Sequence, residues 1–141
     1  MLTRTVIAIA GLMLAFTLVL GDVAVAGRPG GDSSSSSISL VVVNGGEVAS
    51  LDVGPRYGDQ VTFNVATTAT ATPYVNLKCY QNGVLVAEGW EGFFDGALGD
   101  RIFTLWSPQW SAGSADCTAS LAMYGKRRWT ILASVAFHVA P

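Results

Sequence analysis

The chain has 141 residues, a net charge of −2 and 13% charged residues, about half the usual share in folded domains. A weakly acidic chain has no general attraction for nucleic acid, so nucleic-acid binding is excluded as its main function. The length is sufficient for one domain with its own hydrophobic core.

The first 26 residues are organised like a secretory signal peptide. Arg4 gives a basic start, residues 6–20 are almost entirely apolar, and Ala24-Val25-Ala26 predicts cleavage before Gly27. The rival interpretation is an N-terminal membrane anchor, but a spanning helix needs about 20 apolar residues, and Asp22 ends the run too early. We therefore expect a secreted, extracellular protein with no membrane span after cleavage.

Residues 27–37 contain Gly, Ser and a few polar residues, with no large apolar side chain. Such a segment cannot bury enough surface to offset its chain entropy, so it is predicted to be a flexible linker. The remaining residues, 38–141, are predicted to form one β-domain.

The first half of this domain reads as short strands separated by turns. Strands are expected at 38–43 and 47–53, and residues 60–66 alternate most clearly between apolar and polar side chains. The Thr/Ala-rich tract 67–73 fits either a loop or an extension of that strand. A strand at 74–80 leads into Asn82-Gly83, a strong signal for a type I′ hairpin turn.

The second half begins with the partner strand of that hairpin, 84–88, and an unusually aromatic loop, 89–100. A strand is expected at 101–106, followed by a crossover segment. The last two strands, 115–124 and 129–139, form a hairpin whose alternation places two apolar sets on its inner face. These sets are Cys117, Ala119, Leu121 and Met123, and Trp129, Ile131, Ala133, Val135, Phe137 and Val139.

About seven or eight short strands without an amphipathic helix predict an all-β, antiparallel two-sheet sandwich. Cys79 and Cys117 are the only cysteines. In an exported chain they most simply form one disulfide, although two buried free thiols are the alternative.

The run Gly58-Asp59-Gln60-Val61-Thr62-Phe63, and the late run 112–119 leading by a hairpin into 134–139, resemble bacterial secreted immunoglobulin-like domains. The resemblance implies an immunoglobulin-like sandwich. Two features depart from the antibody pattern: the second main strand has no cysteine, and Ala115 replaces the tyrosine two residues before the second cysteine. In this topology Cys79 and Cys117 would lie on neighbouring strands of one sheet.

The residue inventory argues against an enzyme and implies no cofactor or metal. His138 is the only histidine, and no Gly-x-Ser-x-Gly nucleophile motif occurs. Asp95 and Asp100 lack the dense carboxylate spacing of a calcium loop and are expected to be solvated.

Four aromatic residues are candidates for a binding surface: Trp90, Phe93, Phe94 and Trp110. Exposed aromatics stack on sugar rings or anchor protein partners. The alternative is that they fold over one end of the sandwich.

The turn residues Lys126, Arg127 and Arg128 concentrate three cations in an acidic protein. They are either a contact for polyanions or membrane phosphate, or an ordinary solvated turn. Together these features predict a non-catalytic extracellular module that binds a protein partner or has a structural role at the cell surface. The alternative is a carbohydrate-binding module that uses the aromatics of 89–100.

Overall fold

The computed structural model describes residues 34–44, 47–48 and 54–141. The predicted signal peptide, residues 27–33 of the predicted linker, and residues 45–46 and 49–53 lie outside the described residues.

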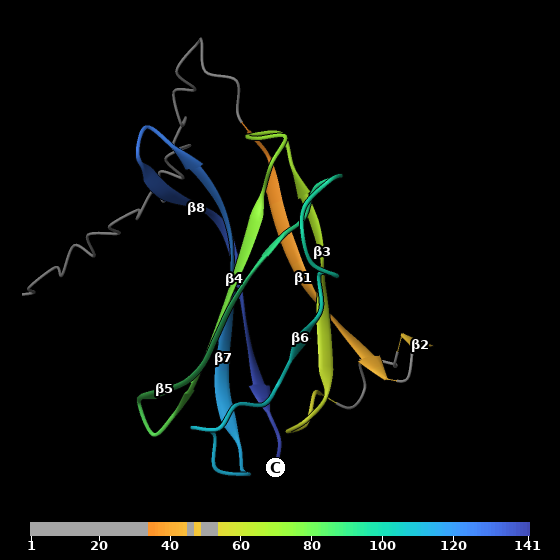
Figure 1. Cartoon of the computed structure of the whole chain (residues 1–141), viewed down its shortest axis with the longest axis vertical. Helices are drawn as coiled ribbons and strands as arrows, with labels where there is room; N and C mark the ends of the chain where they lie inside the picture. The colour runs from red at the N-terminus through yellow and green to blue at the C-terminus, as the bar shows by residue number, and fades with distance from the viewer. Residues whose placement is uncertain (1–33, 45–46, 49–53) are drawn as a thin grey trace, which may run out of the picture. The chain divides into compact units, whose positions relative to one another are not determined.

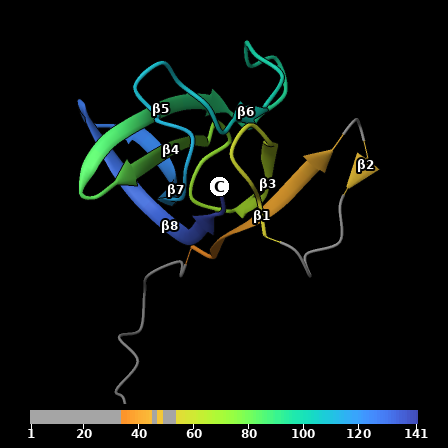
Figure 2. The same ribbon diagram turned by 90° about the horizontal axis from the view of Figure 1, so that it is seen from below.

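Two four-stranded antiparallel sheets form the domain (Figure 1). The first sheet has the order β2-β1-β3-β6 and the second has the order β5-β4-β7-β8. The strands are β1 (Ser36–Asn44), β2 (Glu47–Val48), β3 (Gln60–Thr67), β4 (Tyr74–Gln81), β5 (Val84–Gly92), β6 (Phe103–Thr104), β7 (Ala115–Gly125) and β8 (Arg128–Val139). The predicted all-β two-sheet sandwich is confirmed, and Figure 2 shows its two layers from one end.

The core lies between the inner faces of the two sheets. From the first sheet, Val61 and Phe63 point inward, as their alternation with Thr62 and Asn64 predicts. From the second sheet come Leu77 and Leu121, which are both almost completely buried. Phe63 lies edge-on to the ring of Phe103 at a centroid distance of 5.7 Å. These residues join the two sheets into one hydrophobic core.

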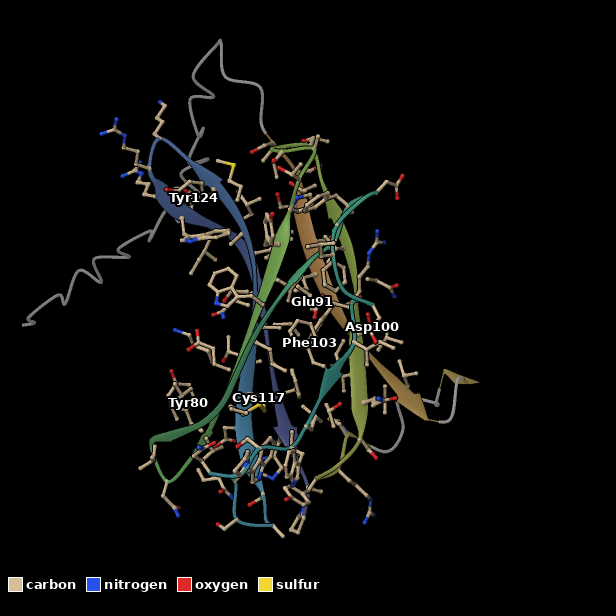
Figure 3. The ribbon with its side chains drawn as sticks, in the orientation of Figure 1. Tyr80, Glu91, Asp100, Phe103, Cys117 and Tyr124 are labelled. Carbon is tan, nitrogen blue, oxygen red and sulfur yellow. A yellow bond between two sulfur atoms is a disulfide. The ribbon has the colours of Figure 1, made fainter. Side chains whose placement is uncertain are left out.

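A disulfide joins Cys79 on β4 to Cys117 on β7, as predicted. The two residues are directly opposite each other in the ladder between neighbouring strands of one sheet. Both are buried in the core, and Figure 3 shows the sulfur atoms beside the Cys117 label. The bond therefore links strands within one sheet and does not cross the sandwich.

Several element boundaries differ from the sequence expectations. β1 begins at Ser36, inside the predicted linker, because Ser36 and Ser37 pair with the end of β3. The tract 68–73 is a loop, so β3 ends at Thr67. The expected strand 101–106 is reduced to the two residues of β6, with Arg101 at φ 63° just before it.

The predicted loop 89–100 begins too early, since β5 continues as a strand through Gly92. Gly89 is the residue that suggests a loop in the sequence. A Cβ atom at this position would lie 3.1 Å from the ring of Phe103, so the glycine permits a close approach inside a strand. As a result Trp90 belongs to β5, where it is paired opposite Asn76.

The expected inner face of β8 is wrong for its first residues. Ala133, Val135 and Phe137 do pack against the core. A bulge shifts the register, so that Leu121 pairs with Ala133 while the adjacent Ala122 pairs with Ile131. The extra residue, Leu132, packs against the core, and the side chains that precede it change faces. Ile131 and Trp129 are consequently exposed on the outer face.

Candidate binding face

Aromatic side chains collect at one end of the outer face of the β5-β4-β7-β8 sheet. The register places Trp90 on the outer row with Asn76, and Tyr74 on the next row with Ala122 and Ile131. Tyr124 and Trp129 are paired opposite each other beyond that row. We call this surface the aromatic face; its members are Tyr74, Trp90, Tyr124, Trp129 and Ile131.

The rings of the aromatic face form one connected cluster. Trp129 is at its centre, with ring centroids 4.5 Å from Trp90, 5.2 Å from Tyr124 and 5.3 Å from Tyr74. The rings of Trp129 and Trp90 are tilted by 39°, and that of Tyr74 is nearly perpendicular to Trp129. Such tilted and edge-to-face contacts hold aromatic rings in defined orientations. The face is therefore preformed.

The cluster is exposed in spite of these mutual contacts. The exposed fraction is 43% for Trp90, 45% for Trp129, 60% for Tyr124 and 65% for Ile131. Beneath them Ala122 is only 1% exposed, because its small side chain lets the surrounding rings close over the strand. A large apolar area open to solvent on a well-packed sheet is typical of a partner site.

The polar side chain paired opposite Trp90 already has hydrogen-bond partners within the protein. The amide of Asn76 is buried, and its Nδ2 donates hydrogen bonds to Glu88 Oε1 at 3.1 Å and to the Gly89 carbonyl at 3.2 Å. Glu88 is also paired with Lys78, at 3.6 Å between Nζ and Oε1. Asn76, Glu88 and Lys78 thus hold β4 and β5 together.

Three cations lie next to the aromatic face at the turn between β7 and β8. Lys126, Arg127 and Arg128 are all exposed, and the ion pairs of the described residues involve Lys78, Arg101 and His138 instead. β4 pairs with β7 only as far as Tyr74 and Ala122, so the end of the hairpin extends beyond β4. Figure 1 shows the hairpin end standing apart from β4, and Figure 3 places Tyr124 close to it.

The four aromatic candidates from the sequence have different positions. Trp90 belongs to the exposed face, and Phe94 is half-buried against Tyr74 at a ring distance of 5.3 Å. Phe93 packs against the core beside Phe63. Trp110 is 3% exposed and donates from Nε1 to the Gly113 carbonyl at 3.0 Å. The expectation that Trp110 belongs to an exposed platform is therefore wrong.

Sequence reasoning missed most of the aromatic face. Tyr74 and Tyr124 are not among the predicted site residues, and Trp129 and Ile131 are predicted to face the core. The reason is the bulge in β8. Residues that would face the core by simple alternation face solvent on the other side of a bulge. The adjacent Leu132 and Ile131 mark where such a change can occur, because two consecutive apolar residues cannot both follow a period of two.

An open groove of about 500 Å³ lies between β5 and the segment 102–109. Leu77, Val86 and Phe103 contribute apolar lining, and Trp90 and Trp106 also border it. Trp90 is thus shared between the groove and the aromatic face. Glu88 and Glu91 also line the groove, so its charged groups are acidic.

The described residues contain no group of three or more His, Cys, Asp and Glu side chains that could hold a metal ion. His138 faces solvent, where its Nδ1 lies 2.8 Å from Asp116 Oδ1 on the adjacent strand. Across the described ranges, no helix has the length and apolarity needed to cross a membrane.

Comparisons with known proteins give no match: no family model, no curated protein and no solved structure is similar to this chain at a significant level.

Proposed function

We propose that this protein is a secreted, non-catalytic module with an immunoglobulin-like arrangement, which binds an extracellular protein through its aromatic face. The strand order supports the immunoglobulin-like assignment. In immunoglobulin-type sandwiches one sheet contains strands A, B and E, and the other contains C, F and G, extended by C′. Apart from the two-residue edge strand β2, the orders β1-β3-β6 and β5-β4-β7-β8 correspond to A-B-E and C′-C-F-G.

The exposure of Trp90 and Trp129, in contact with each other on one sheet, is the observation that carries the proposal. Exposed tryptophan and tyrosine side chains lose little conformational entropy when a partner covers them, and they bury a large area. Trp, Tyr and Arg are also the residues most enriched at binding hot spots. The aromatic face and the turn beside it contain all three.

A protein partner fits this face better than a neutral sugar does. Sugar recognition requires hydrogen-bonding side chains for hydroxyl groups as well as rings for stacking. The nearby Asn76 amide is committed to Glu88 and Gly89. The aliphatic side chain of Ile131 adds an apolar contact without any hydrogen-bonding group.

Carbohydrate binding is the second candidate function, and one observation favours it. Trp90 and Trp129 present two adjoining, partly exposed rings on an open face. Such a pair offers stacking surfaces to consecutive sugar units.

A capture experiment tests the proposal. The mature chain is immobilised and exposed to culture medium of the producing cells, in parallel with the variants Trp90→Ala and Trp129→Ala. Trp106→Ala is the matched control, because Trp106 is 53% exposed and outside the ring cluster. We expect a protein that wild type and the control retain and the two face variants lose. Retention by all four chains, or by none, would contradict the proposal, and a ring-dependent signal on a glycan array would favour the second candidate.

A further inference from the structure

Two hairpin turns in this domain have the same length and a similar backbone conformation, but their residues differ in size and charge. The β4–β5 turn consists of Asn82 and Gly83, at φ 49° and 79°. The β7–β8 turn consists of Lys126 and Arg127, at φ 51° and 63°. In both turns the two strand residues that flank the loop are paired with each other. Two positive φ values in a two-residue loop define the type I′ geometry.

Asn-Gly is the preferred sequence for this geometry, because asparagine tolerates the left-handed region and glycine has no Cβ atom. The first turn follows this preference. In the second turn two long cationic side chains occupy conformations that such residues rarely adopt. Non-glycine residues held in strained conformations occur preferentially at functional sites. The turn geometry therefore does not explain why lysine and arginine are present here.

The position of these cations gives a second, independent observation. Arg128 continues the charged run into β8, and the next residue is Trp129, opposite Tyr124. The cations are exposed, and the ion pairs of the described residues do not include them. Exposed positive charge beside an exposed apolar cluster is complementary to a ligand that combines negative charge with apolar groups.

We infer that the β7–β8 turn and the aromatic face form one site for an acidic protein segment that also carries aromatic or aliphatic side chains. This inference rests on the proposed function and specifies the chemistry of the partner. The carboxylates of the segment pair with Lys126, Arg127 and Arg128, and its apolar side chains pack on Trp129, Tyr124 and Ile131. Arginine suits this role because its planar guanidinium can hold a carboxylate by two hydrogen bonds.

The described geometry favours a polypeptide over the other polyanions. Anionic lipid would also attract the three cations, but the exposed rings are spread over the sheet face from Trp90 on β5 to Trp129 on β8 and are not gathered at the hairpin end. An acidic polysaccharide would require partners for its many hydroxyl groups, but the Asn76 amide and the Ser120 and Ser134 hydroxyls in the row beside the rings are bonded to neighbouring groups of the sheet. Membranes and polysaccharides enter the test as competing outcomes.

The test measures binding of the mature chain to an immobilised random copolymer of glutamate and tyrosine by biolayer interferometry. Polyglutamate, alginate and vesicles containing phosphatidylglycerol are the comparison probes. We expect the tightest binding to the copolymer, with weaker binding to polyglutamate. Binding to the copolymer should weaken as salt is raised, because the charges are exposed.

Two sets of variants separate the effect of the charges on binding from effects on the stability of the fold. Lys126→Asn combined with Arg127→Gly replaces the turn by the sequence of the other hairpin and removes two cations. We expect its melting temperature to equal or exceed that of wild type, while copolymer affinity falls by about tenfold. Arg128→Glu is compared with Arg56→Glu, which makes the same charge change at the other end of β8, where Arg56 bridges to Ala140. Only Arg128→Glu should weaken binding.

The outcomes distinguish this inference from the proposed function. Equal copolymer affinity of wild type and the turn variant, or equal effects of the Arg128 and Arg56 variants, would overturn the inference. Alginate or vesicle binding as tight as copolymer binding would overturn it as well. If the culture-medium experiment yields a partner that the Trp90 and Trp129 variants lose but the turn variant keeps, the proposed function holds and the inference fails.

Discussion

The four tryptophans of the chain have different roles because their environments differ. Trp110 is buried, its indole nitrogen has a hydrogen-bond partner, and its ring lies edge-on to Tyr57 at 5.5 Å. Trp90, Trp106 and Trp129 are each about half exposed. A buried indole with a satisfied donor stabilises the fold, whereas an exposed indole contributes little to folding and is available for binding.

This contrast leads to a prediction for stability. Trp110→Ala should lower the free energy of unfolding by about 3–5 kcal/mol, because it removes a large buried side chain and leaves a cavity. Trp106→Ala should have a much smaller effect. Urea denaturation of both variants measures the difference. Equal losses for the two variants would mean that Trp110 is not part of the core.

Gly89 gives a second prediction at the residue scale. The nearest ring atom of Phe103 would be 3.1 Å from a Cβ atom at position 89, which is closer than ordinary van der Waals contact. Gly89→Val should therefore displace Phe103 and destabilise the domain by about 1–3 kcal/mol. Gly125→Val, at a position where no atom lies within 4 Å of the added Cβ and the backbone is not left-handed, is the control and should have a smaller effect. Thermal unfolding of both variants gives the comparison.

At the scale of elements, the disulfide between β4 and β7 is the main covalent constraint. It closes a loop with a sequence separation of 38 residues. In the chain-entropy model a loop of this size stabilises the fold by about 3–4 kcal/mol. The double variant Cys79→Ala with Cys117→Ala should lose a comparable amount of unfolding free energy in denaturant unfolding.

Mass spectrometry without reduction should find the two cysteines joined in the exported protein; two alkylatable thiols would contradict this pairing.

The β7–β8 hairpin has one half in the core and one half exposed to solvent. Its disulfide-bearing half packs in the core, whereas its far end extends beyond β4 and carries Tyr124, Trp129 and the cations. The bulge at Leu121 and Ala122 lies between these halves and changes which residues of β8 face the core. A bulge that turns side chains outward near a proposed site agrees with the usual occurrence of bulges.

At the scale of the whole molecule, the prediction concerns export. Cleavage before Gly27 should leave a mature chain of 141 − 26 = 115 residues. Intact mass measurement and N-terminal sequencing of the protein from culture medium test this expectation. A product that retains residues 1–26 in the membrane fraction would favour the anchor instead.

The sequence alone was sufficient to predict the sandwich class, most strand positions, the Asn82-Gly83 turn and the cysteine pair. These features depend on local alternation, turn chemistry and composition, which act over a few residues. Only the tertiary structure decided that Trp110 is buried and that Trp129 and Ile131 face solvent. These outcomes depend on a one-residue bulge and on packing between distant segments. The adjacent apolar residues Ile131 and Leu132 show where a bulge can occur but not that it does, and packing between distant segments leaves no local pattern. A shift of one residue in a strand exchanges its two faces. Trp129 and Ile131 belong to the aromatic face because of that shift, whereas Trp90, Tyr74 and Tyr124 lie on it by ordinary alternation.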